Sequence, residues 1–129
     1  MMATLTSDHY EMIHFYNNLL NTIEEGFDYV VQSFTNLELT EGDRIFKDIL
    51  AAFYHVDSTH KTLYALLQDK HELVEEMGKF DQVILALDED SSIFTSLDTH
   101  QEFVKNHLFP SYLAWKESMQ KQLKPYIIH

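Results

Sequence analysis

The sequence predicts an all-α protein, folded as one domain over residues 1–129 into an up-and-down bundle of about four helices. Apolar residues recur along the chain at the three- and four-residue spacing of an α-helix. Only three Gly and two Pro interrupt this pattern, which disfavours a turn-rich β sandwich or barrel. Aromatic residues make up 13% of the chain, which is enough apolar surface for a collapsed core.

The first helix is predicted over residues 8–35. Asp8 is expected to be its N-cap, with Glu11 three residues later completing a capping box. Gly26 lies beside the apolar stripe, where a small residue favours a close helix crossing. The stripe follows steps of three and four and lies on one helix face, so it must be buried. Its members are Ile13, Tyr16, Leu20, Ile23, Phe27, Val30 and Phe34.

The second helix is predicted over residues 40–69, with Thr40 as its cap and Asp43 in its first turn. The run from Asp57 to His60 is its weakest part, because Ser, Thr and Asp side chains compete with helix hydrogen bonds. The apolar track comprises Ile45, Ile49, Phe53, Val56, His60, Leu63 and Leu67.

A third and a fourth helix are predicted on either side of the acidic run 88–92, which favours a break and a new cap. Pro110 lies inside the fourth track and predicts a kink near residues 106–110, and Pro125 is expected to end the helix. A three-helix arrangement, with residues 72–124 as one broken element, is the structural alternative. The third track is Leu73, Met77, Phe80, Ile84 and Leu87, and the fourth is Ile93, Leu97, His100, Val104, Leu108, Tyr112, Trp115, Met119 and Leu123.

The predicted core combines the stripe of the first helix with apolar residues from the other three. Trp115, which follows the predicted kink in the last track, is expected to be buried. The further members are Ile49, Phe53, Val56, Leu63, Phe80, Ile84, Leu108 and Met119.

The charge of the chain bounds its partners. With 21 acidic and 9 basic residues the net charge is −12, which opposes binding to a phosphate backbone, so no nucleic acid is expected. Four lysines near the C-terminal end are expected to complement helix dipoles and neighbouring acids. No apolar run approaches the length of a membrane span, and the first ten residues do not resemble a secretory signal, so a cytoplasmic protein is expected. The lysines are Lys105, Lys116, Lys121 and Lys124.

Histidine spacing raises one chemical hypothesis. His60 and His100 lie on core tracks, His107 is seven residues beyond His100, and Asp57 precedes His60 by three. Bundle metal proteins place carboxylates and imidazoles inward in this way, and such a set suits zinc, iron or manganese. The competing interpretation, which we favour, is that a His at a core edge shares a hydrogen bond and binds no metal. His14 has the same spacing from Glu11 and lies off the stripe, so the pattern also arises without a site.

No catalytic signature appears in the sequence. The three Gly are isolated, which excludes a phosphate-binding loop, and no spacing links Ser, His and Asp as a catalytic triad. The chain has no Cys, so thiolate chemistry and Cys-based zinc sites are excluded. We therefore expect no enzymatic activity and no cofactor. An acidic mimic of DNA is a minor third possibility.

Several aromatic residues lie beside or off the core tracks. Either they pack on a second neighbouring helix, or they form an exposed patch for another protein or a second copy of the chain. The apolar tail 126–128 is expected to lie on the bundle or in a dimer. A protein-binding or self-associating module is therefore the expected function. These aromatic residues are Tyr10, Phe15, Tyr29, Phe46, Tyr54, Tyr64, Phe94 and Phe109.

One stretch is familiar. Residues 103–115 read Phe-Val-Lys-Asn-His-Leu-Phe-Pro-Ser-Tyr-Leu-Ala-Trp, a leucine-rich helix with Pro110 followed by Trp115. This stretch, with the length and acidity of the chain, resembles a group of uncharacterised small acidic helical-bundle proteins of Gram-positive bacteria. The resemblance implies a bacterial helical bundle and no particular chemistry.

Overall fold

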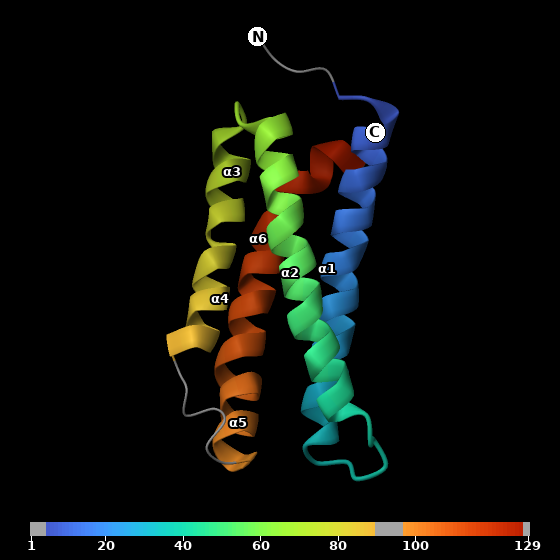
Figure 1. Cartoon of the computed structure of the whole chain (residues 1–129), viewed down its shortest axis with the longest axis vertical. Helices are drawn as coiled ribbons and strands as arrows, with labels where there is room; N and C mark the ends of the chain where they lie inside the picture. Colours follow the sequence, from blue (N-terminus) through green and yellow to red (C-terminus); the bar gives the residue numbers. More distant parts are fainter. Residues whose placement is uncertain (1–4, 90–96, 128–129) are drawn as a thin grey trace.

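The computed structural model describes residues 5–89 and 97–127, and every regular element among them is helical. In Figure 1 the helices of the described residues run alternately down and up the bundle, and the last two of these runs are each built from more than one element. The all-α bundle predicted from the sequence is confirmed. In chain order the elements are α1 (Ser7–Ser33), α2 (Gly42–Leu67), α3 (His71–Gly78), α4 (Phe80–Glu89), α5 (Leu97–Phe103), η2 (Val104–Leu108) and α6 (Phe109–Ile127).

The three-helix alternative is wrong. Helices α3 and α4 follow one another down one column, and α5, η2 and α6 run back up beside them (Figure 1). The run 88–92, where a break was predicted, lies only partly within the described residues. Helix α4 continues to Glu89, and residues 90–96 lie outside the described part of the chain.

The start of α1 differs from the prediction by two residues. Thr6 is the N-cap: its backbone is extended and its hydroxyl accepts a hydrogen bond of 3.2 Å from the amide of His9. The Nδ1 atom of His9 in turn accepts from the Thr6 amide at 3.0 Å. This reciprocal pair has the geometry of a capping box and leaves Asp8 inside the first turn, where a negative charge complements the helix dipole.

The start of α2 also departs from the prediction, because Glu41 and not Thr40 occupies the cap position. The Glu41 side chain makes no capping hydrogen bond and instead pairs with Arg44 at 2.6 Å, while its backbone amide donates to Tyr29 Oη at 3.2 Å. The run from Asp57 to His60, which the sequence marks as the weakest part of the second helix, is helical in the structure. The hydroxyl of Thr59 donates to the carbonyl of His55 one turn earlier, so it is satisfied inside the helix.

The third predicted helix is divided at Lys79. Its amide contacts the carbonyls of both Glu75 and Glu76, at 3.3 and 3.2 Å, which ends α3 in a tightened turn before α4 begins. Gly78 precedes this turn and contributes no side chain to hold the helix. The apolar periodicity continues across the break, which explains why the sequence pattern indicated one helix.

Where a kink was predicted near residues 106–110, the structure has a π-helical turn just before Pro110. In η2 each turn is wider than in an α-helix, and the amide of Phe109 bonds to the carbonyl of Val104 five residues earlier. The wider turn accommodates a residue without an N–H. Pro125, by contrast, does not end α6, because Tyr126 and Ile127 pack against the core and hold a further turn. In Figure 1 this red end of α6 approaches the blue start of α1.

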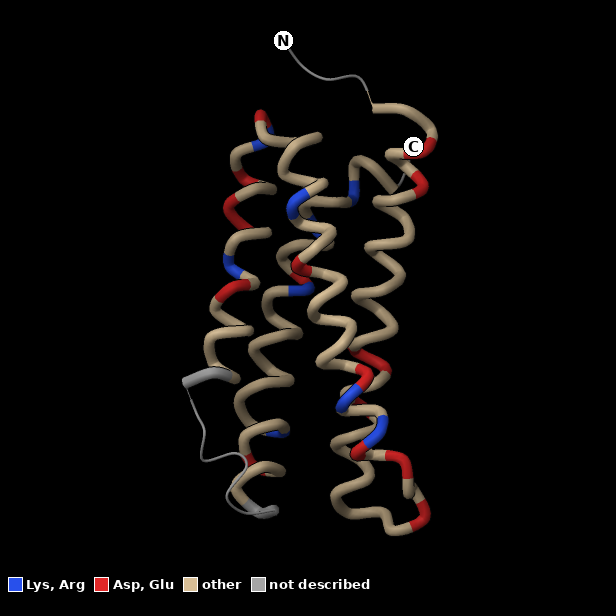
Figure 2. Tube along the Cα trace, in the orientation of Figure 1, with Lys and Arg blue, Asp and Glu red and all other residues tan. Residues whose placement is uncertain are grey.

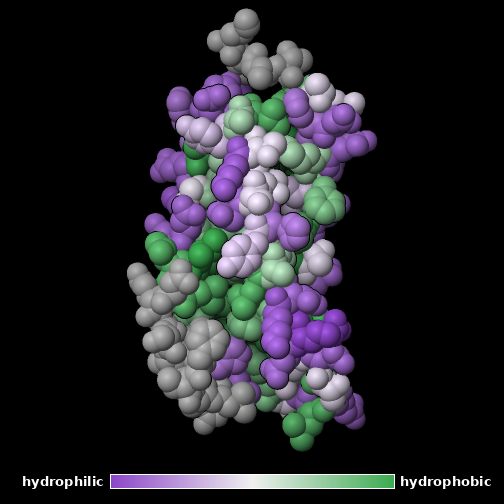
Figure 3. All heavy atoms as spheres, in the orientation of Figure 1, coloured by the Kyte–Doolittle hydropathy of each residue, from purple (hydrophilic) through white to green (hydrophobic). Residues whose placement is uncertain are grey.

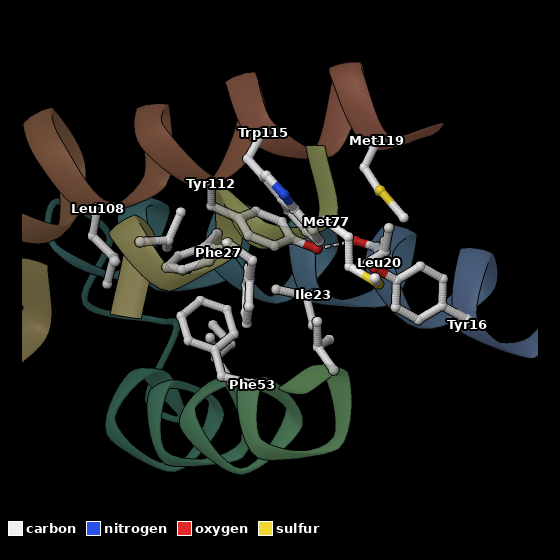
Figure 4. Packing of buried hydrophobic residues seen from close by; sticks show 14 of the residues in the cluster. Tyr16, Leu20, Ile23, Phe27, Phe53, Met77, Leu108, Tyr112, Trp115 and Met119 are labelled. Atoms are coloured by element: carbon white, nitrogen blue, oxygen red, sulfur yellow. Dashed lines mark hydrogen bonds between the residues drawn. The ribbon is translucent and has the colours of Figure 1, made fainter. Parts of the chain in front are cut away.

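The core lies where the apolar stripes of the helices meet. Every predicted core residue is buried except Phe34 and Ile84, which are half-buried at its edge. Figure 4 shows Phe27, Phe53 and Tyr112 packed together, and Tyr112 Oη donates to the carbonyl of Leu20 at 2.8 Å. The aromatic rings thus fill the space between α1, α2 and α6.

Gly26 has the predicted role in the crossing of α1 and α2. A Cβ atom built on Gly26 would lie 3.2 Å from Cγ1 of Ile49, which is tighter than ordinary van der Waals contact. The two helices therefore approach closely at this level.

Candidate functional site

His60 is the most buried of the histidines singled out from the sequence. It is 9% exposed and lies among the rings of Tyr16, Phe80 and Trp115, and a hydrogen bond of 2.6 Å joins its Nε2 atom to Tyr16 Oη. Burial lowers the pKa of His60 to about 4, and the carboxylate of Asp57 opposes this shift only in part. Burial also raises the pKa of Tyr16 well above its usual value. Both groups are therefore neutral at physiological pH.

The structure does not assemble the metal site considered from the sequence. His100 packs edge-on against Phe34 and Phe46 at the other end of the bundle, and His107 is exposed on η2. His100 precedes Trp115, the neighbour of His60, by fifteen residues, which is roughly 22 Å of helical rise. Across residues 5–89 and 97–127 no three His, Asp or Glu side chains gather as metal ligands. His60 and His100 both face the interior from their own helices, as their core tracks predicted, but they lie at different levels along the bundle.

An open groove of about 480 Å³ lies between α2 and the α3–α4 column. His60 and Asp57 line it from α2, and Val74 and Asp81 line it from the other side. Tyr64 also lines the groove, and Tyr54, 79% exposed, lies further along α2. In Figure 3, which views this side of the molecule, hydrophobic residues gather over α4.

A second groove, of about 320 Å³, lies between α1 and α2 on another side of the bundle. Its lining is almost entirely apolar and includes Leu19, Gly26, Ile45 and Ala52. Phe15, which is 71% exposed, lies one turn of α1 before Leu19. The groove thus continues an apolar surface along α1.

Polar side chains cover the outer surface of the bundle where α1 and α6 meet, which we call the closed side. Lys116, only 8% exposed, pairs with Glu24 at 3.1 Å and donates to Gln120 Oε1 at 3.0 Å. The amide of Gln120 donates to Asn17 and Asn21 of α1 at 3.0 and 2.9 Å. Lys116 therefore complements a neighbouring acid, as predicted for the C-terminal lysines.

The aromatic residues outside the core tracks divide into two groups. Phe46 is buried and Phe109 stacks on Phe27 at 4.9 Å between ring centres, so both pack on a second neighbour. Phe15, Tyr54 and Tyr64 are exposed beside the grooves. Phe94 lies outside the described residues. The apolar tail lies on the bundle as far as residue 127. Sequence periodicity alone does not separate the two groups, because both occupy flanking helical positions.

None of the helices described here combines the length and the apolar character that crossing a lipid bilayer requires.

Comparison with known proteins finds relatives without an assigned activity. The family model described as a domain of unknown function, DUF8042, matches residues 11–118. The chain is 34% identical over 122 residues to the Uncharacterized protein YvzG of Bacillus subtilis (strain 168), and the alignment covers 93% of this chain and 95% of that protein. No solved structure matches the chain. The predicted resemblance to uncharacterised proteins of Gram-positive bacteria is confirmed.

Proposed function

The chain belongs to the DUF8042 family, and we propose that it acts as a protein-binding module and not as an enzyme. The observation that carries this proposal is the pair of open grooves beside exposed aromatic side chains. Phe15, 71% exposed, lies one turn of α1 before Leu19 of the α1–α2 groove, and Tyr54, 79% exposed, lies three residues before Asp57 of the other groove. Large aromatic side chains beside a concave apolar surface are typical of the anchor residues of protein interfaces.

The buried polar groups support a structural role for the interior. Tyr112 donates to a backbone carbonyl of α1, and Trp115 Nε1 donates to the carbonyl of Glu76 on α3 at 2.7 Å. Tyr16 and His60 bond to each other. These bonds join the helices to one another, so the buried polar groups serve the structure. We therefore place the functional site on the outer surface.

The charge supports a protein partner in the cytoplasm. A net charge of −12 opposes association with nucleic acid and with anionic lipid, whereas a protein surface can supply complementary groups. Self-association is the second form of the proposal, because either groove can accept a helix from another copy.

Site-specific photocrosslinking in cells that naturally produce the protein tests this function. A photoreactive phenylalanine analogue replaces Phe15 or Tyr54, and Glu117, which is exposed on α6, provides the control position. We expect a discrete crosslinked protein from at least one groove position and none from Glu117. Equal labelling at all three positions, or none at any, would contradict the proposal. Light scattering of the purified chain then separates a second copy from a different protein.

A further inference from the structure

Helix α1 carries a second series of residues beside its core stripe. Its members follow steps of four, three, four and three, the spacing of a helix-packing surface. The α1–α2 groove is lined by all of them except Phe15, which extends the series by one turn. The series is Phe15, Leu19, Thr22, Gly26 and Tyr29.

The form of this groove fits one additional helix. Its middle is built from small residues, Gly26 and Thr22 on α1 and Ala52 on α2, and small residues allow a helix axis to approach closely. The aromatic rings of Phe15 and Tyr29 lie at its two ends. These ends are fourteen residues apart, or roughly 21 Å along α1, which is the length of about four helical turns.

The charges around the groove select the occupant. Glu25 lies on the α1 side and Asp48 on the α2 side, and no Lys or Arg is among the lining residues. The nearby Arg44 is engaged with Glu41 at 2.6 Å and with Asp48 at 3.5 Å. Figure 2 shows charged residues concentrated where the C-terminal part of α1 adjoins the first turns of α2. In a two-fold symmetric dimer through this groove, the acids of one copy would face the same acids of the other.

We infer that the α1–α2 groove binds an amphipathic helix of another protein, apolar on one face and flanked by Lys or Arg. This inference rests on the proposed function and names the site and the partner chemistry. The apolar face of the partner covers Leu19, Ile45 and Ala52, while its basic residues meet Glu25 and Asp48. The aromatic ring of Phe15 covers one end of the bound helix.

A pair of synthetic peptides tests the charge requirement. Both have about 18 residues with leucines at helical spacing, and the flanking positions carry Lys in one peptide and Glu in the other. We expect the Lys peptide to bind the intact chain in fluorescence anisotropy and the Glu peptide not to bind. Affinity for the Lys peptide should fall as salt is raised, because exposed charge pairs are screened. Equal binding of both peptides, or of neither, would overturn the inference.

Paired variants locate the site. The double change Glu25→Lys and Asp48→Lys should weaken Lys-peptide binding by about tenfold, because attraction becomes repulsion on both walls. The matched control, Glu75→Lys with Asp81→Lys, makes the same change in charge at exposed positions of the α3–α4 column and should leave binding unchanged. The reverse result would assign the peptide to the other groove and refute this site.

Shape is tested separately from charge. Thr22 is exposed, so Thr22→Trp fills the middle of the groove without disturbing the core and should abolish peptide binding. Phe15→Ala should weaken binding severalfold, whereas Tyr54→Ala, equally exposed elsewhere, should not. Circular dichroism and the thermal midpoint confirm that each variant is folded. Unchanged binding by folded Thr22→Trp would place the peptide outside this groove.

The outcomes separate this inference from the proposed function. A dimer in light scattering that Thr22→Trp dissociates would assign the groove to a second copy and overturn the inference. Crosslinks from Tyr54 alone would also overturn it, while the proposed protein-binding function would stand. If neither groove position gives a crosslink, both this inference and the proposed protein-binding function are wrong.

Discussion

Between α1 and α6 a series of side-chain hydrogen bonds covers the surface, whereas between α2 and α3 an open groove of about 480 Å³ remains. On the closed side, Lys116 and Gln120 span the distance to Glu24, Asn17 and Asn21. Both interfaces are built on the same kind of apolar stripe.

The open side differs in the polar residues that flank the stripe. Asp57 and Lys61 line the groove from α2 and Asp81 lines it from α4, and no ion pair among the described residues joins these two walls as Lys116 and Glu24 join α6 and α1. Gly78 adds no side chain to fill the space, and the imidazole of His60 reaches the groove wall. The comparison shows that apolar stripes assemble the bundle, while the flanking polar residues decide which interfaces close.

The largest expected effect is at the point where α6 meets the open side. Trp115 is 5% exposed, contacts Phe80 and His60, and bonds through its indole nitrogen to the Glu76 carbonyl. Trp115→Ala should lower the free energy of unfolding by roughly 3–5 kcal/mol, because it removes a large buried ring and leaves a cavity. Urea denaturation measures this loss. A loss under about 1 kcal/mol would show that the open side is too loosely packed to depend on this ring.

The second effect concerns pH and the open side. The folded pKa of His60 is about 4, below its usual value of 6.5, so the unfolded chain binds the proton more readily. Stability from this group is complete above pH 6.5 and is lost as pH falls from 6.5 towards 4, by roughly 3 kcal/mol in all. Chemical denaturation across this range measures the loss.

His60→Gln is the matched control for the pH effect, because it keeps a hydrogen-bonding group near Tyr16 and removes the titration. The difference in free energy of unfolding between wild type and His60→Gln should become independent of pH above pH 6.5. Parallel curves for wild type and His60→Gln would show that the open groove hydrates His60 and removes its burial cost.

The smallest effect is expected on the closed side. Lys116→Met keeps the length of the side chain and removes the pair with Glu24, whose side chain is 39% exposed and remains hydrated. The expected loss is about 1 kcal/mol or less, because a partly exposed pair contributes little to stability. Lys121→Met, at an exposed position, provides the baseline in the same thermal unfolding assay. A loss above 3 kcal/mol would mean that the hydrogen-bond series, and not the apolar stripe, holds α6 to α1.

Much of the fold follows from local patterns. The stripe of α1 and the track of α2 are buried as predicted, except for the half-buried Phe34 and Ile45, since a continuous apolar face on a long helix can only be covered by other helices. The irregular turn near Pro110 was also foreseeable, because a missing N–H disturbs any α-helix. Helix ends were predicted less well. Thr6 and Glu41 replaced the expected caps because capping depends on small differences among neighbouring polar residues.

The sequence predicted which types of residue the candidate sites would contain, but not where those residues lie in the fold. His60 and His100 lie on the apolar tracks of two different helices, yet they stand at different levels of the bundle, so no metal site forms from them. The exposure of Phe15 and Tyr54 and the burial of Phe46 depend on which helices became neighbours.

The sequence by itself determined that this protein is a helical bundle and which residues form most of its core. Only the tertiary structure decided which interfaces closed and which became grooves. The physical reason is that hydrophobic periodicity acts within one helix and is visible in the chain. The contacts of Gly26 with Ile49, and of Lys116 with Glu24, join residues far apart in sequence and exist only after the helices pack.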